Sequence, residues 1–257
     1  MPVRRRFIKL GLLSLLSACA AKSNRGKSSV SLTISVAASL QDVMQNLGKL
    51  YLQRMPQVNL NYNFGASGSL RYQIEQGAPV DVYISAAKQH MDGLDRQNLL
   101  LSNTRQNLLK NEIVLITARD NTSINQFDQL TSDRVSQVAI GAPQSVPAGK
   151  YAQEVLNFFQ LYSALASKLI FAKNVRQVLA YVETGNVDAG IVYSTDAQIS
   201  KRVRIAAVAP ANSHDPVVYP VAVIQNSKQA VVAQDFVKFL TSDAAQMVFE
   251  AYGFINC

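Results

Sequence analysis

The sequence predicts an α/β fold in two lobes, and two features of the chain support this prediction. The first is an alternation of short apolar runs with longer helical stripes from Ser31 onward, which is typical of parallel sheets covered by helices. The second is a restart of the same alternation near residue 111. The chain has 257 residues, of which 48% are hydrophobic, and this is enough for one large core or two modest ones.

The N-terminal segment predicts export and a lipid anchor. Basic residues at 4–6 precede a short apolar run that ends at Cys19, an arrangement typical of signal peptides and too short to span a bilayer. "LSAC" at 16–19 resembles the lipobox of bacterial lipoproteins, whose cysteine receives a lipid. "RRRFIK" at 4–9 resembles a twin-arginine export motif, although the general secretory route also fits.

From this segment we expect a lipoprotein-type signal peptide over residues 1–18, lipidation of Cys19 and a flexible tether over residues 19–30. The protein would then lie in the periplasm or on the outer face of the cytoplasmic membrane.

Composition excludes several classes of function. The formal net charge is +8, but the basic residues form no stripe and no aromatic residues lie between them, so we expect no nucleic-acid partner. Cys19 and Cys257 are the only cysteines, too few for a disulfide framework or a cysteine metal site. We also expect a monomer, no cofactor and no metal coordinated directly by the protein.

The first half of the chain predicts three strands and three helices. Its apolar periodicity changes between a period of two and a helical period along the segment. The predicted strands cover residues 31–39, 57–64 and 80–85, and the predicted helices cover residues 40–55, 68–77 and 88–97.

The second half repeats this pattern and then returns to the first lobe. Strands are predicted at 111–117, 137–141, 189–194 and 217–224, and helices at 148–160, 174–185 and within 229–254. We expect the chain to cross between lobes near 109–113 and near 218–221. Lobe 1 would contain residues 31–110 and 221–257, and lobe 2 residues 111–220.

Four predicted strand-to-helix junctions share one chemistry. Ser39 and Ser67 stand at the first two helix starts, Ala148 at the third and Val175 at the fourth. The first turn of a helix has backbone N–H groups without intrahelical partners, and the helix dipole makes this end partly positive. A serine hydroxyl adds a donor, and small neighbours such as "GASGS" at 65–69 let a compact anion approach the backbone. These junctions favour a bound oxyanion.

Each of these residues also has a purely structural interpretation. Ser39, with Asp42 three residues later, is typical of an ordinary helix cap, as is Ser67. Ala148 and Val175 can act only through their backbone N–H groups. Tyr193, at the end of the strand "GIVYS", could simply be a core aromatic residue.

Taken together, these stretches resemble the periplasmic molybdate-binding proteins of ABC importers from about residue 31 to residue 254. The motifs, in family order, are "AASL" at 37–40, "FGASGSLRYQIEQGAPVDVYIS" at 64–85, "VPAGKYA" at 146–152, "NVR" at 174–176 and "GIVYSTDA" at 190–197. The resemblance implies the type II periplasmic-binding fold, with two α/β lobes joined by a two-strand hinge and the ligand in the cleft.

The resemblance also implies the ligand and the residues that hold it. In this family two serine hydroxyls, backbone amides and a tyrosine hydroxyl bind molybdate or tungstate, and these positions match Ser39, Ser67, Ala148, Val175 and Tyr193. The closed protein would deliver the oxyanion to a membrane permease. No covalent step is implied, so the protein would be a binding protein and not an enzyme.

Two alternatives remain open at this point. A receptor for sulfate or another tetrahedral oxyanion could share the same architecture, because no residue type identifies the anion. A serine hydrolase is a more distant alternative, since "GASGS" partly matches a nucleophile elbow but ends in Ser69 instead of glycine. The chain has only His90 and His214 to serve as a catalytic base.

Overall fold

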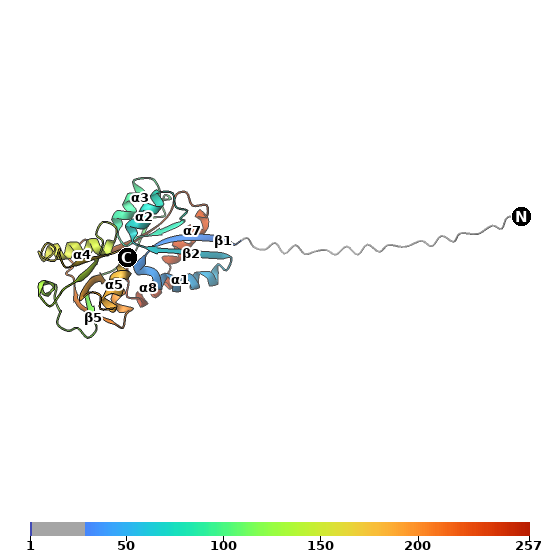
Figure 1. Ribbon diagram of the computed structural model, residues 1–257. Helices are drawn as coiled ribbons and strands as arrows, with labels where there is room; N and C mark the ends of the chain where they lie inside the picture. The colour runs from blue at the N-terminus through green and yellow to red at the C-terminus, as the bar shows by residue number, and fades with distance from the viewer. Residues whose placement is uncertain (2–28) are drawn as a thin grey trace.

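The computed structural model of the protein describes Met1 and residues 29–257 (Figure 1). The predicted signal peptide, Cys19 and nearly all of the tether therefore lie outside the described residues. Within the described part, the elements form two sheets, each with helices packed around it (Figure 1). No helix of this part is both long and apolar enough to cross a membrane.

The first sheet has six strands in the order β11-β4-β10-β3-β1-β2. Strands β1, β2 and β3 run parallel, whereas β10 is antiparallel to β3 and β4. Its strands are β1 (Val30–Ala37), β2 (Val58–Gly65), β3 (Val82–Ile84), β4 (Gln106–Lys110), β10 (Val218–Val223) and β11 (Ile255–Asn256). The helices of this lobe are η1 (Ala38–Leu40), α1 (Gln41–Arg54), α2 (Ser67–Glu75), α3 (Lys88–Asp95), α7 (Ala230–Leu240) and α8 (Asp243–Ala251).

The second sheet has five strands in the order β7-β6-β8-β5-β9. Strand β6 is parallel to β7 and β8, whereas β5 is antiparallel to β8 and β9. Its strands are β5 (Ile113–Ala118), β6 (Val138–Gly141), β7 (Leu169–Ala172), β8 (Ala189–Tyr193) and β9 (Val203–Val208). The helices are η2 (Asp128–Thr131), α4 (Pro147–Phe158), α5 (Val175–Glu183) and α6 (Ser194–Gln198).

The chain crosses between the sheets twice. Asn111 and Glu112 join β4 to β5, and residues 209–217 join β9 to β10. After the second crossing, β10 pairs with β4 from Val218 onward. The two crossings touch where the Asn111 N–H donates to the Val217 carbonyl oxygen, at 3.3 Å.

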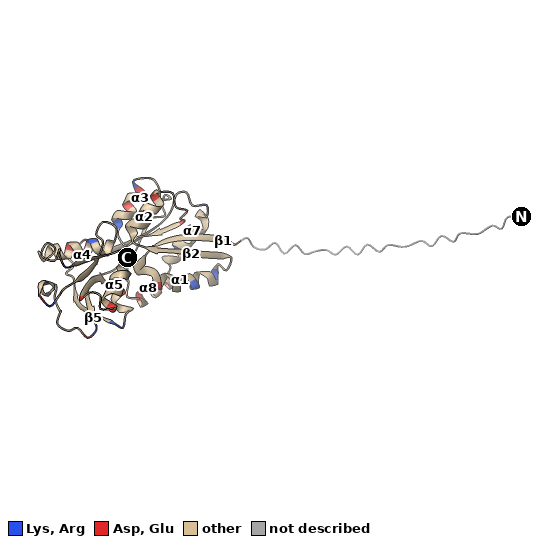
Figure 2. Cartoon of the chain, viewed as in Figure 1, with Lys and Arg blue, Asp and Glu red and all other residues tan. Residues whose placement is uncertain are grey.

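Burial in the core accounts for the apolar runs that the strands have in the sequence. Leu32, Ile34 and Val36 of β1 are fully buried, as are the corresponding side chains of β5. Most of the buried apolar residues form one core that continues through both lobes, and a smaller separate cluster includes Leu70 of α2 and Leu94 of α3. Figure 2 shows charged residues mainly on helices and loops, with the strands largely free of them. Because the parallel strands are covered on both faces, the polar ends of these strands are where a ligand can reach the sheet.

Candidate functional site

A small cavity lies where the carboxyl ends of strands from both sheets face each other. Its wall contains all five residues that the sequence singled out: Ser39, Ser67, Ala148, Val175 and Tyr193. The remaining lining residues are mostly small, namely Ala37, Ala38, Gly65, Ala66, Ala86, Val146, Pro147 and Asn174. The cavity therefore brings residues from four helix starts and one strand end to a single place.

Ser39 lies in η1, directly after β1, and is 4% exposed. Its Oγ is 3.0 Å from the hydroxyl oxygen of Tyr219 on β10, and either atom could be the donor of this hydrogen bond. Its carbonyl oxygen accepts from Nη2 of Arg176 at 3.1 Å. Ser39 is thus held on two sides while it faces the cavity.

Ser67 is the first residue of α2 and is 1% exposed. Its Oγ accepts a hydrogen bond from the Ala86 N–H at 3.0 Å, and its carbonyl oxygen accepts from the Tyr83 hydroxyl at 2.7 Å. Because the Oγ is already engaged as an acceptor, its own proton is directed elsewhere. The hydroxyl is therefore set to donate to a group in the cavity.

Ala148 and Val175 present backbone N–H groups from the first turns of α4 and α5. Pro147 begins α4, and the Asn174 side chain caps α5 by accepting from the Gln177 N–H at 3.0 Å. Neither feature occupies the N–H of Ala148 or Val175, which lack intrahelical partners by their position. Both helix dipoles also make this part of the wall favourable for negative charge.

Tyr193 ends β8 and is 1% exposed. Its hydroxyl oxygen is buried and has no hydrogen-bond partner among the described residues. Burial raises the pKa of this hydroxyl well above its usual value, so the group stays neutral and keeps its proton. A buried hydroxyl without a partner is costly, and a ligand oxygen in the cavity would remove that cost.

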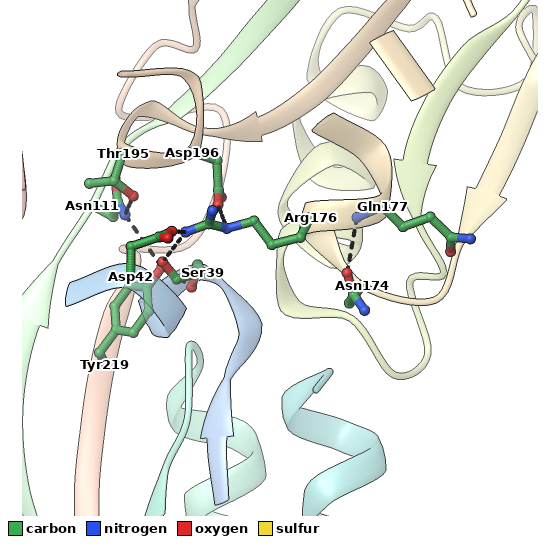
Figure 3. A network of polar contacts seen from close by, with 9 residues as sticks. All are labelled: Ser39, Asp42, Asn111, Asn174, Arg176, Gln177, Thr195, Asp196 and Tyr219. Atoms are coloured by element: carbon green, nitrogen blue, oxygen red, sulfur yellow. Dashed lines mark hydrogen bonds and ion pairs between the residues drawn. The ribbon is translucent and has the colours of Figure 1, made fainter. Parts of the chain in front are cut away.

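An ion-pair network beside the cavity was not predicted from the sequence (Figure 3). Arg176 of α5 pairs through Nη2 with Asp42 of α1 and through Nε with Asp196 of α6, each at 2.7 Å. Asp196 is fully buried, and this burial raises its pKa to about 6, although Arg176 acts in the opposite sense. The sequence does contain Arg176 in "NVR" and Asp42 after Ser39, but neither local pattern indicates that the two side chains pair.

The electrostatics of the cavity follow from this network. The carboxylates of Asp42 and Asp196 both pair with Arg176. No charged side chain is among the residues that line the cavity. Within the described chain there is also no cluster of His, Cys, Asp and Glu that could hold a metal ion. The arrangement can therefore hold a small anion through neutral donors.

The hydrolase alternative finds no support in this geometry. The hydrogen-bond partner of Ser67 Oγ is a backbone N–H, whereas a nucleophilic serine needs a base within reach of its proton. His90 and His214 are both absent from the cavity wall, and burial lowers the pKa of His90 to about 4.

The two lobes touch each other around the cavity. The Gly68 N–H of α2 donates to the Ser145 carbonyl oxygen of the second lobe at 2.9 Å, and the Arg176–Asp42 pair also joins the lobes. A Cβ atom at Gly68 would lie 2.7 Å from the Ser145 oxygen, so a glycine is needed for this approach. These contacts bring the two halves of the wall together.

Comparisons with known proteins agree with this architecture. The family model for bacterial extracellular solute-binding proteins matches residues 32–255. YvgL of Bacillus subtilis, named as a substrate-binding lipoprotein of an ABC transporter, is 40% identical over 93% of this chain and 93% of its own length. The molybdate-binding protein ModA of Haemophilus influenzae is 38% identical over 88% of this chain and 90% of its own length.

A solved structure extends the comparison to the fold. The periplasmic molybdate-binding protein of Azotobacter vinelandii superposes with a TM-score of 0.80, covering 88% of this chain and 99% of that chain at 23% identity. The predicted two-lobe α/β fold of the type II periplasmic-binding proteins is thereby confirmed. The chain belongs to the family of bacterial extracellular solute-binding proteins.

Proposed function

We propose that this protein captures molybdate, and also tungstate, and delivers it to the permease of an ABC importer. The observation that carries the proposal is the donor set of one small cavity: the free hydroxyl of Tyr193, the directed hydroxyl of Ser67 and the first-turn N–H groups of Ala148 and Val175. Relatives named as molybdate-binding proteins support the choice of anion.

The mechanism follows from how the donors are divided. Ser39 and Ser67 belong to the first lobe, whereas Ala148, Val175 and Tyr193 belong to the second. An oxyanion with several oxygens is satisfied only when both groups of donors reach it, so its binding favours the closed arrangement of the lobes. The permease would then recognise the closed form, and no bond is made or broken in the ligand.

Calorimetry tests this proposal directly. The chain from residue 20 onward is titrated with molybdate, tungstate, sulfate and phosphate. We expect molybdate and tungstate to bind, with sulfate and phosphate much weaker. Tight sulfate binding with weak molybdate binding would identify a receptor for another tetrahedral oxyanion, and no binding of any of the four would contradict the proposal as a whole.

We also propose that the protein is held at the membrane surface by a lipid on Cys19. The lipobox at 16–19 and the lipoprotein name of YvgL support this anchorage. The intact mass of the protein from the membrane fraction should exceed that of residues 19–257 by the mass of a lipid. A Cys19→Ala variant should lack this increment.

A further inference from the structure

The two serines of the cavity differ in how clearly their hydrogen bonds fix the direction of the hydroxyl proton. Ser67 Oγ accepts from a backbone N–H, which has only one direction of donation, so its proton is free. Ser39 Oγ instead faces the Tyr219 hydroxyl at 3.0 Å, and either oxygen could donate. Whether Ser39 can donate to a ligand therefore depends on what fixes the proton of Tyr219.

Asn111 fixes the direction of the Tyr219 proton, and a backbone N–H group fixes the orientation of the Asn111 side chain. Its Oδ1 accepts from the Glu112 N–H at 2.9 Å, so Nδ2 is the atom that faces the other way. This Nδ2 donates to the Tyr219 hydroxyl oxygen at 3.3 Å and to Thr195 Oγ1 at 2.9 Å. The Tyr219 oxygen is thus an acceptor toward Asn111 (Figure 3).

Ser39 Oγ is then the acceptor left for the Tyr219 proton. Tyr219 is fully buried, and its hydroxyl has hydrogen-bond partners only in Asn111 and Ser39 among the described residues. If Ser39 donated to Tyr219, the Tyr219 proton would be buried without an acceptor, which is costly. If Tyr219 donates to Ser39, every group is satisfied and the Ser39 proton is free.

We propose that Tyr219 and Asn111 form a relay that makes Ser39 a hydrogen-bond donor into the cavity. The relay runs from the Glu112 N–H through the Asn111 amide and the Tyr219 hydroxyl to Ser39 Oγ, and it ends at the bound anion. Tyr219 is a positioning residue in this role, because it acts through Ser39 and is not among the residues that line the cavity. The inference rests on the proposed function, since it assigns a role in oxyanion binding.

The relay also bears on which anions are accepted. With Tyr219 donating to Ser39 and Ala86 donating to Ser67, both serine oxygens already act as acceptors within the protein. The wall then presents protons to the ligand from both serines. An anion that carries its own O–H has no acceptor aimed at it, so a fully deprotonated oxyanion is favoured.

A double-mutant cycle tests the relay. The dissociation constant for molybdate is measured by calorimetry for the wild type, Tyr219→Phe, Ser39→Ala and the double variant. Phenylalanine keeps the ring that packs 5.7 Å from the rings of Tyr193 and Phe254 but removes the hydroxyl. We expect Tyr219→Phe to raise Kd about tenfold in the wild-type background, because Ser39 loses the partner that directs its proton.

The cycle separates this role from a structural one. In the Ser39→Ala background, Tyr219→Phe should leave Kd unchanged, because the residue it acts through is gone. Equal effects in both backgrounds would overturn the relay, as would an unchanged Kd for Tyr219→Phe alone. If the wild type itself fails to bind any oxyanion, the proposed function is wrong and the relay fails with it, whereas the other two outcomes leave the proposed function standing.

Two further variants keep the test sharp. Tyr51→Phe is the matched control, because Tyr51 is also fully buried and loses a hydroxyl bond, here to Asp235 at 2.9 Å, away from the cavity. It should alter thermal stability but not Kd.

If Tyr219→Phe does not fold, Asn111→Asp replaces it in the cycle. A carboxylate at this position would accept the Tyr219 proton, so Kd should rise in the wild-type background more than in the Ser39→Ala background.

Discussion

At the scale of single residues, Ser67 shows how the fold assigns one direction to a hydroxyl group. Its side chain is buried at a helix start, where serine ordinarily acts as a cap, yet α2 has no side-chain cap bond. The Oγ instead accepts from the Ala86 N–H, which follows β3 in the same lobe. The side chain is therefore available to the cavity and not to its own helix.

Replacing Ser67 by alanine should weaken oxyanion binding strongly. A hydrogen bond to a charged group contributes about 1.5–3 kcal/mol, so the Kd for molybdate should rise roughly tenfold to a hundredfold in calorimetry. Ser69→Ala is the matched control, because Ser69 is an exposed serine in the same helix and should leave Kd unaltered. Wild-type affinity in Ser67→Ala would place the ligand elsewhere.

Candidate residues for the site could be chosen from the sequence where the pattern is local. Serines at helix starts, small neighbours and a strand-end tyrosine are visible in short stretches, and the structure brings them to one cavity. The partners of those residues were not predictable. Tyr219 is 180 positions from Ser39, and Arg176 is 137 positions from the Ser39 carbonyl that it contacts. Such pairs depend on how the lobes pack, which no local pattern reveals.

At the scale of elements, the start of α4 depends on an unusually close approach to β6. A Cβ atom at Gly149 would lie 2.0 Å from the carbonyl oxygen of Gly141 at the end of that strand. The glycine lets the helix begin directly over the strand end, and this places the Ala148 N–H in the cavity wall. The "PAG" sequence at 147–149 is thus explained by close packing against β6 as well as by its position at a helix start.

Gly149→Ala should disturb both stability and binding. The added methyl meets backbone atoms that cannot turn away, and such overpacking costs about 1–3 kcal/mol. Urea unfolding should show this loss in the free energy of unfolding, and calorimetry should show weaker molybdate binding because the Ala148 N–H is displaced. Retention of full stability and full affinity would show that α4 can shift at no cost.

Elements were predicted best where their apolar pattern is long. The stripe of α1 and the runs of β1 and β5 were identified within a few residues. Strands β4 and β7 were not assigned from the sequence, because exposed positions interrupt their apolar runs, and three of the five residues of β4 are exposed. β7 is an edge strand whose middle residues are partly or fully exposed, so its sequence lacks the continuous apolar signal of the central strands.

At the scale of the whole molecule, ion pairs and backbone contacts determine how the two lobes meet. The Arg176–Asp42 pair joins α5 of the second lobe to α1 of the first, and the Asp42 side chain is 44% exposed. Its contribution is therefore modest, because water screens such pairs. The more buried partner of Arg176 is Asp196, which lies in the same lobe and holds the guanidinium in place.

Asp42→Asn should shift the lobes away from closure without changing the cavity wall. An exposed pair contributes about 0.2–1 kcal/mol, so Kd for molybdate should rise by about fivefold at most. Small-angle scattering should show a larger radius of gyration at subsaturating ligand. Glu75→Gln is the control, because the Arg71–Glu75 pair lies within α2 of one lobe and should affect neither quantity. A larger effect in the control than in Asp42→Asn would contradict this account.

The partners that orient the two serines have a consequence for the order of events in capture. Tyr219 on β10 and Ala86 shortly after β3 lie in the first lobe with the two serines, so the bonds that the serine hydroxyls make within the protein do not cross to the second lobe. We expect an arriving anion to meet the two serine hydroxyls first, before the donors of the second lobe reach it. For the proposed function we expect capture in two steps: an encounter whose rate rises with the anion concentration, and a slower rotation of the lobes whose rate does not depend on that concentration.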